Sequence, residues 1–193
     1  MFLELAEFLR CPSDHEEKPL VVATGAMKRR SIVFGTIGCP VCRKEFLIID
    51  GVARLGEVDE VPAPESMAAS DMVHAWLGLA SPGGYVVLVG SAGQLAAGLT
   101  ARMEEVRFIA VNPIGEVGAP RVSVIRGPGI MVRSGMARGV VVGAERASEP
   151  WLREAARVLL RGQRLVVLTE KVTPPDGVDQ QAVGHGAWVG VKR

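Results

Sequence analysis

The chain has 193 residues, of which 48% are hydrophobic and 22% are charged, and its formal net charge is +1. This composition is typical of a folded protein with an apolar core. A net charge so close to zero excludes the strong overall positive charge of many nucleic-acid-binding domains. Three cysteines, an odd number, argue against a disulfide framework and for a reducing compartment. The first residues lack the features of a signal peptide, and no apolar run is long enough to cross a bilayer, so we expect a cytoplasmic protein without a membrane span.

The first 56 residues predict a small unit of one short helix and three strands. Apolar residues at helical spacing indicate the helix within residues 2–10. Short apolar runs indicate the strands, at residues 20–23, 31–36 and 46–49, and residues 52–55 close the unit. A unit of this size buries little apolar surface, and such units usually need a metal or a disulfide to be stable.

All three cysteines lie in two loops of this unit, Cys11 in CPSD and Cys39 and Cys42 in CPVC. A Cys-x-x-Cys turn can hold one metal ion between its two thiolates, and tetrahedral zinc takes four ligands. Cys11 is the third candidate ligand. The fourth is Asp14, preferred because it lies three residues after Cys11, or the neighbouring His15. The alternatives to a zinc site are a redox-active Cys39/Cys42 pair and simple burial of the thiols.

A change of composition follows this unit. Residues 56–65, GEVDEVPAPE, contain four acids, two prolines and no basic residue, which is typical of a solvated linker. We therefore expect two domains, residues 1–56 and residues 67–193, joined by a linker at residues 57–66.

The second domain alternates apolar strands with helices. Helices are predicted at residues 67–79, 94–105 and 149–161. Strands are predicted at residues 85–89, 106–111, 122–125, 139–142 and 164–168, with a last antiparallel strand at the edge, residues 187–191. Near-continuous apolar strands between helices indicate a parallel sheet covered on both faces. The fold class expected is α/β, a small N-terminal unit followed by a Rossmann-like, mostly parallel, doubly wound sheet.

The N-terminal sequence LAEFLRCP…GCPVCRKEFLIIDGVARL resembles the Trm112-like zinc-ribbon family. The resemblance covers nearly all of the first 55 residues and includes the Asp50-Gly51 turn; the chain departs from the family at Asp14, which replaces the second cysteine. Members of this family activate methyltransferases as partners or form the N-terminal ribbon of one. The resemblance therefore implies a zinc ion and a protein partner.

The segment GVVVGAERASEPWLREAARVLLRGQRLVVL resembles a class I S-adenosylmethionine-dependent methyltransferase domain. The resemblance extends over residues 67–193 and places the cofactor at the carboxyl ends of the strands. The candidate cofactor-binding residues are Gly90, Ser91, Gly93, Asn112 and Glu145.

Two positions of this chain depart from the methyltransferase pattern. Leu88 stands where the family has an acid in its first strand, and Asn112 stands where the family's acid binds the ribose hydroxyls. Asn lacks the charge-assisted hydrogen bonds of a carboxylate. We assign no catalytic residue and expect a retained fold with a degraded cofactor site.

Two functions remain open at this point. The first is a zinc-binding, methyltransferase-like accessory or scaffold protein that works through a protein partner or through self-association. The alternative is an active S-adenosylmethionine-dependent methyltransferase that acts on RNA or on another translation-related or small-molecule substrate.

Overall fold

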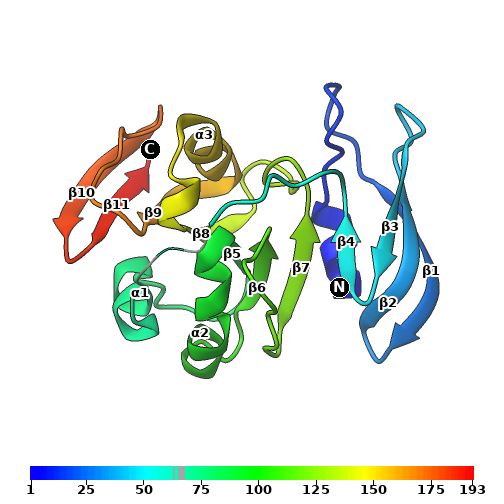
Figure 1. Cartoon of the computed structure of the whole chain (residues 1–193), viewed down its shortest axis with the longest axis horizontal. Helices are drawn as coiled ribbons and strands as arrows, with labels where there is room; N and C mark the ends of the chain where they lie inside the picture. The colour runs from blue at the N-terminus through cyan, green and yellow to red at the C-terminus, as the bar shows by residue number, and fades with distance from the viewer. Residues whose placement is uncertain (63, 65–67) are drawn as a thin grey trace.

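The computed structural model describes residues 1–62, 64 and 68–193, and one sheet runs through the whole molecule (Figure 1). Its eleven strands within the described residues have the order β1-β2-β3-β4-β7-β6-β5-β8-β9-β11-β10. Their bounds are β1 Val21–Lys28, β2 Ser31–Gly38, β3 Glu45–Ile49, β4 Val52–Arg54, β5 Tyr85–Val89, β6 Arg107–Val111, β7 Val122–Arg126, β8 Ala137–Val142, β9 Leu159–Val167, β10 Val178–Gly184 and β11 Ala187–Lys192.

Six neighbouring strands, from β4 to β9 in this order, run parallel and form the middle of the sheet. Strand β5 is central and buried along its whole length, so its YVVLV sequence is apolar on both faces. The chain proceeds from β5 to β6 and β7 on one side and to β8 and β9 on the other, which is the doubly wound plan. The expected α/β class with a parallel core is therefore confirmed, and the large mixed sheet is consistent with a Rossmann-like methyltransferase fold.

Helices cover both faces of the sheet. Helices α1 (Ser70–Leu77) and α2 (Ala96–Arg102) pack on the face that carries Val86 and Leu88. Helix α3 (Glu149–Val158) packs on the opposite face. The sequence of α3 explains its position, because its apolar residues fall on one side of the helix while Glu149 and Arg153 are exposed on the other.

The 3-10 helix η1 (Leu3–Phe8) shares the face of α3 and belongs to the same core. Leu5 and Leu9 are fully buried, and Leu9 forms an isolated antiparallel bridge with Val132 in the β7–β8 connection. The Phe2 N–H donates to Ser123 Oγ on β7 at 3.0 Å. The N-terminal segment thus covers part of the sheet built by the second half of the chain.

The predicted domain boundary falls inside this continuous structure. Strand β4 pairs in parallel with β7, in the register Val52↔Val124 and Arg54↔Arg126. Residues 1–56 and the later strands therefore share one sheet and one core, and the division into two domains stays a prediction. Residues 63, 65 and 66 of the predicted linker, and residue 67 at the predicted helix start, lie outside the described residues.

The C-terminal end of the sheet differs from the expectation. Strand β11 is antiparallel to β9, as expected, but it lies inside the sheet, and β10 forms the edge. Strand β10 was not predicted because only Val178 of its residues is buried, so it lacks the apolar pattern of a core strand. His185 and Gly186, both with positive φ, form the two-residue turn that joins β10 to β11.

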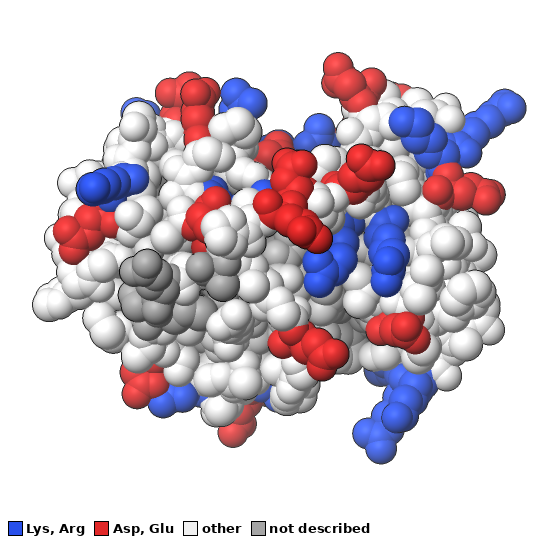
Figure 2. All heavy atoms as spheres, viewed as in Figure 1, with Lys and Arg blue, Asp and Glu red and all other residues white. Residues whose placement is uncertain are grey.

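Charged groups of both signs are scattered over the surface in small clusters (Figure 2). No helix of the described residues is long and apolar enough to cross a membrane.

Candidate functional site

Two loops of the N-terminal unit bring the cysteines together. One loop follows η1 and carries Cys11, and the other joins β2 to β3 and carries Cys39 and Cys42. The second loop is a tight turn in which the Cys39 N–H donates to the Lys44 carbonyl and the Arg43 N–H donates to the Cys39 carbonyl, both at 2.9 Å. Arg43 has a φ of 60°, so the turn reverses the chain within a few residues.

Four side chains of these loops have the geometry of a metal site. The ligand atoms of Cys11, His15, Cys39 and Cys42 all lie within 4.8 Å of one another. Cys11 Sγ is 3.6 Å from Cys42 Sγ, and Cys39 Sγ is 3.3 Å from His15 Nε2. In a tetrahedron with Zn–S bonds of 2.3 Å the ligand atoms are about 3.8 Å apart. The Cys3His cluster could therefore hold a metal ion such as zinc.

The fourth member of the cluster is His15, whereas the residue spacing favoured Asp14. Asp14 is exposed and does not belong to the group. His15 Nδ1 lies 2.8 Å from the Glu16 carbonyl, so it can donate a proton there while Nε2 faces the thiols. Metal-binding histidines usually make such a bond with their second nitrogen, which fixes the ring.

The surroundings of the cluster favour a thiolate at one of its sulfurs. Hydrogen bonding from the Lys44 backbone, and then from His15, lowers the pKa of Cys42 to about 6. Burial raises the pKa of the Cys11 thiol. The carbonyl of Glu16 raises the pKa of His15. Thiolates are the metal-binding form of cysteine, and the lowered pKa of Cys42 favours this form at neutral pH.

The structure also brings together three of the residues expected to bind the cofactor. Strand β5 leads into the 3-10 helix η2 (Gly90–Leu95), and strand β8 leads into the 3-10 helix η3 (Ala144–Arg146). Glu145 Oε1 accepts a hydrogen bond from the Ser91 N–H, and Glu145 Oε2 accepts one from the Ser91 hydroxyl, each at 2.7 Å. A side chain at Gly90, which has a φ of 63°, would overlap this carboxylate. The polar groups at the end of β5 are thus bonded within the chain.

Asn112, the residue expected at the ribose, is separately bonded. Its Nδ2 donates to the Gly127 carbonyl at 2.7 Å, and its Oδ1 accepts from the Gly127 N–H at 2.9 Å. Only 4% of the residue is exposed. Gly93 packs against Pro113, which leaves no room there for a side chain. The amide of Asn112 therefore joins the ends of β6 and β7 and does not face an open site.

A feature that the sequence did not indicate closes the same edge of the sheet. The segment after β4 crosses it, and Arg146, which is 4% exposed, donates to the Asp59 carbonyl at 2.6 Å. The Arg146 guanidinium also lies 4.8 Å from the centre of the Trp151 ring. These contacts give Arg146 a buried structural role.

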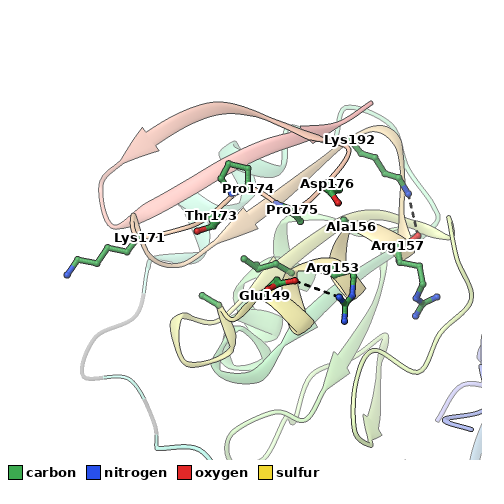
Figure 3. A pocket seen from close by; sticks show the side chains of 12 residues that line it. Glu149, Arg153, Ala156, Arg157, Lys171, Thr173, Pro174, Pro175, Asp176 and Lys192 are labelled. Carbon is green, nitrogen blue, oxygen red and sulfur yellow. Dashed lines mark hydrogen bonds and ion pairs between the residues drawn. The ribbon is translucent and has the colours of Figure 1, made fainter. Parts of the chain in front are cut away.

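A separate cavity lies elsewhere in the molecule. It measures about 670 Å³ and lies between α3 and the β9–β10 connection (Figure 3). Leu152, Ala156 and Pro174 form apolar walls, and Lys192 closes one end. None of the expected cofactor-binding residues lines this cavity.

Comparisons with known proteins reach only distant structures. No family model and no curated protein matches the chain. The antibiotic-resistance methyltransferase Kmr aligns with 12% identity over 66% of this chain and 94% of its own, with a TM-score of 0.44. A SAM dependent methyltransferase from Aquifex aeolicus aligns with 17% identity over 64% and 88%, with a TM-score of 0.47.

Proposed function

We propose that this is a zinc-binding, methyltransferase-like protein that does not transfer methyl groups and that acts through protein contacts. The observation that carries the proposal is the double hydrogen bond from Ser91 to Glu145 at the end of β5. A turn at this point, before a helix, offers N–H groups to an anionic ligand. In this chain the Glu145 carboxylate takes the place of that anion.

Asn112 supports the same proposal. A residue that binds a ribose must present free polar atoms, whereas both ends of this amide are bonded to Gly127. Breaking those bonds would leave a buried N–H and a buried carbonyl without partners, at a cost of about 1–3 kcal/mol for each group. A bound cofactor would have to supply that free energy.

The role proposed for the metal is structural. Four protein ligands complete the coordination of zinc and leave no position open for water or substrate, as in structural zinc sites. We propose that the ion holds the loop after η1 against the β2–β3 loop, as in a zinc ribbon. The chain would supply three thiolates and the Nε2 of His15 to this ion.

A calorimetric titration of the zinc-loaded protein with S-adenosylmethionine and with S-adenosylhomocysteine tests the proposal. We expect no saturable heat at ligand concentrations near 1 mM, where a Kd tighter than millimolar would be detected. Saturable binding to the wild-type chain would overturn the proposal and favour the active methyltransferase. The Glu145→Gln variant serves as a comparison. Its neutral amide weakens the two hydrogen bonds that Ser91 donates to this side chain, while the size of the side chain stays the same.

The Asn112→Asp variant restores the acid that is typical of methyltransferases. We expect it to lower the free energy of unfolding by about 2 kcal/mol, because the new carboxylate would face the Gly127 carbonyl in a buried site. We also expect no gain in S-adenosylmethionine binding. Chemical denaturation and the same titration measure the two effects. A variant that binds the cofactor at unchanged stability would contradict the structural role assigned to Asn112.

A further inference from the structure

One face of the sheet carries no helix over β2, β3, β4 and β7, and only residues 113–118 of the β6–β7 connection border it, beside Val52, Val124 and Arg126. Helices α1 and α2 cover the same face over the strands around β5, and in Figure 1 no helix extends in front of β7, β4 and β3. We define the bare face by six residues that lie on it: Phe34, Leu47, Val52, Arg54, Val124 and Arg126.

The strand registers show that these residues form one continuous surface. Leu47 is paired with Arg54, and Arg54 is paired with Arg126. Val52 is paired with Val124 in the adjacent row. Phe34 lies two residues before Thr36, which is the partner of Leu47, so it projects from the same side of the sheet.

The two sides of these strands differ sharply in burial. Ile48, Ala53 and Ile125, which alternate with the residues of the bare face, are 0% exposed. Phe34 is 52% exposed and Leu47 is 47% exposed. Large apolar side chains gathered on one exposed surface are typical of a contact site.

The charges of the bare face suit a second copy of the same face. Arg54 and Arg126 lie side by side in the register, and like charges in such a pair repel each other. Among the described residues no carboxylate forms an ion pair with either arginine. Asp50 lies two residues before Val52, toward the other end of β4. A cavity of about 420 Å³ is lined by Asp50, Val52 and Val124, and also by Arg126 and by Glu116 of the β6–β7 connection.

We propose that two copies of the chain pack against each other through the bare face. A twofold axis that crosses the strands at the level of Val52 and Val124 places these two valines of one copy against the same two valines of the other. It also brings Asp50 of each copy to the level of Arg54 of its partner. In Figure 2 basic groups lie over this part of the molecule with acidic groups on both sides of them. The formal net charge of +1 adds almost no repulsion between copies.

This inference rests on the proposed function and deepens it, because it names the protein that is contacted and the surface used. Sheets that pack face to face bury their facing side chains in a layer about 10 Å thick. Such a contact would cover Phe34 and Leu47. It would also place Asp50 of one copy near Arg54 of the other.

Sedimentation velocity of the zinc-loaded chain between about 1 and 100 μM tests the proposal, a range that resolves dimers of micromolar Kd. We expect a reversible dimer in the wild-type protein that dissociates further at high salt. Leu47→Asp should be monomeric throughout, and Arg54→Glu should raise the dimer Kd at least about tenfold. Circular dichroism and zinc content would show that the variants remain folded.

Val183→Asp is the matched control. Val183 is 46% exposed, close to the value for Leu47, but it lies on β10 at the opposite edge of the sheet. This variant should dimerise like the wild type. A wild-type chain that stays monomeric, or a Val183→Asp effect as large as that of Leu47→Asp, would overturn the proposal. Sedimentation does not depend on cofactor binding. The test of dimerisation and the titration with S-adenosylmethionine can therefore give opposite outcomes.

Discussion

At the scale of single residues, His15 has the contacts expected of a metal ligand. One ring nitrogen faces the Cys39 sulfur at 3.3 Å, and the other is 2.8 Å from a main-chain carbonyl. A ring held in this way loses little further freedom when an ion binds. The neighbouring Asp14 lies outside the cluster, so the two residues offer a test of the ligand set.

Replacement of His15 by Ala should remove one ligand and weaken zinc binding by at least about 10–100-fold, the loss typical even of residues that only support a metal ligand. Asp14→Ala should leave the affinity unchanged. Competition with a chromophoric chelator measures both values. A loss in Asp14→Ala that matches the loss in His15→Ala would contradict the assignment of His15.

The sequence predicted this site in part, and the reason is physical. A Cys-x-x-Cys turn is a local structure, so the sequence alone places Cys39 beside Cys42. The choice between Asp14 and His15 depends on how the first loop folds against the second. That contact joins distant parts of the chain, and no residue spacing reports it. The bond between Ser91 and Glu145 was missed for the same reason.

At the scale of elements, η1 occupies a place on the sheet that no helix of the β6–β7 or β7–β8 connections takes up in the described residues. An ion-pair group holds it there. Glu4 binds Arg30 in the β1–β2 turn and lies 3.0 Å from Arg107 Nη1 on β6. The guanidinium of Arg107 also lies 5.6 Å from the centre of the Phe2 ring.

The Glu4 group predicts a dependence of stability on acid pH. The backbone N–H of Glu4, then Arg30 and Arg107, lower the pKa of Glu4 from 4.5 to about 2 in the folded chain. Its stabilising contribution is therefore complete above pH 4.5 and is lost as the pH falls toward 2. Because the groups are partly exposed, we expect about 1 kcal/mol.

Urea denaturation of Glu4→Gln between pH 2 and 7 checks this expectation. The variant should be less stable than the wild type at pH 7 and equal to it near pH 2. Glu7→Gln, on the exposed side of η1, is the control and should follow the wild-type curve. Parallel curves for the wild type and Glu4→Gln at all pH values would rule out the ion-pair group as the cause.

Elements with a strong local pattern were predicted well. Strand β5 has the bounds 85–89 that its apolar sequence indicated, and α3 begins at Glu149 as expected. Strand β10 was missed because its residues are almost all exposed, and α2 is shorter than its sequence suggested. Local propensity determines buried strands and amphipathic helices, whereas an exposed edge strand depends on the neighbour that it pairs with.

At the scale of the whole molecule, the metal loops and the parallel sheet belong to one core. Cys11, Cys39 and Leu9 are in the same buried cluster as Val87 and residues of α3. An Arg10–Glu17 ion pair of 3.4 Å and an Arg157–Glu17 ion pair of 3.3 Å link the first loop to α3. We therefore expect the chain to unfold in one step.

The three tryptophans offer a convenient probe of that single step. Trp76, Trp151 and Trp188 all lie outside residues 1–56. Leu9→Ala removes a fully buried side chain and should lower the free energy of unfolding by about 2–5 kcal/mol, and this loss should be visible in tryptophan fluorescence. Removal of zinc by a chelator should shift the same transition to lower denaturant concentration. An unfolding transition, followed by tryptophan fluorescence, that is the same with and without these two changes would indicate two independent units.

The linker composition predicts two domains, and the structure adds that β4 and β7, on either side of the linker, pair with each other. A run of acids and prolines indicates only that the segment is solvated. It does not report whether the strands on either side of it pair. The sequence therefore did not predict the pairing of β4 with β7.

The pairing of β4 with β7 also affects how the chain can acquire its structure. Strand β4 ends at Arg54, but its partner begins only at Val122, so the contact closes a long loop and slows folding. While the ribosome makes the intervening residues, one edge of β4 has no strand to bind. An open edge of this kind can recruit a strand from another chain. The nascent protein is thus most exposed to misassembly in the interval before β7 emerges, and a chaperone that shields β4 during this interval should raise the yield of folded protein.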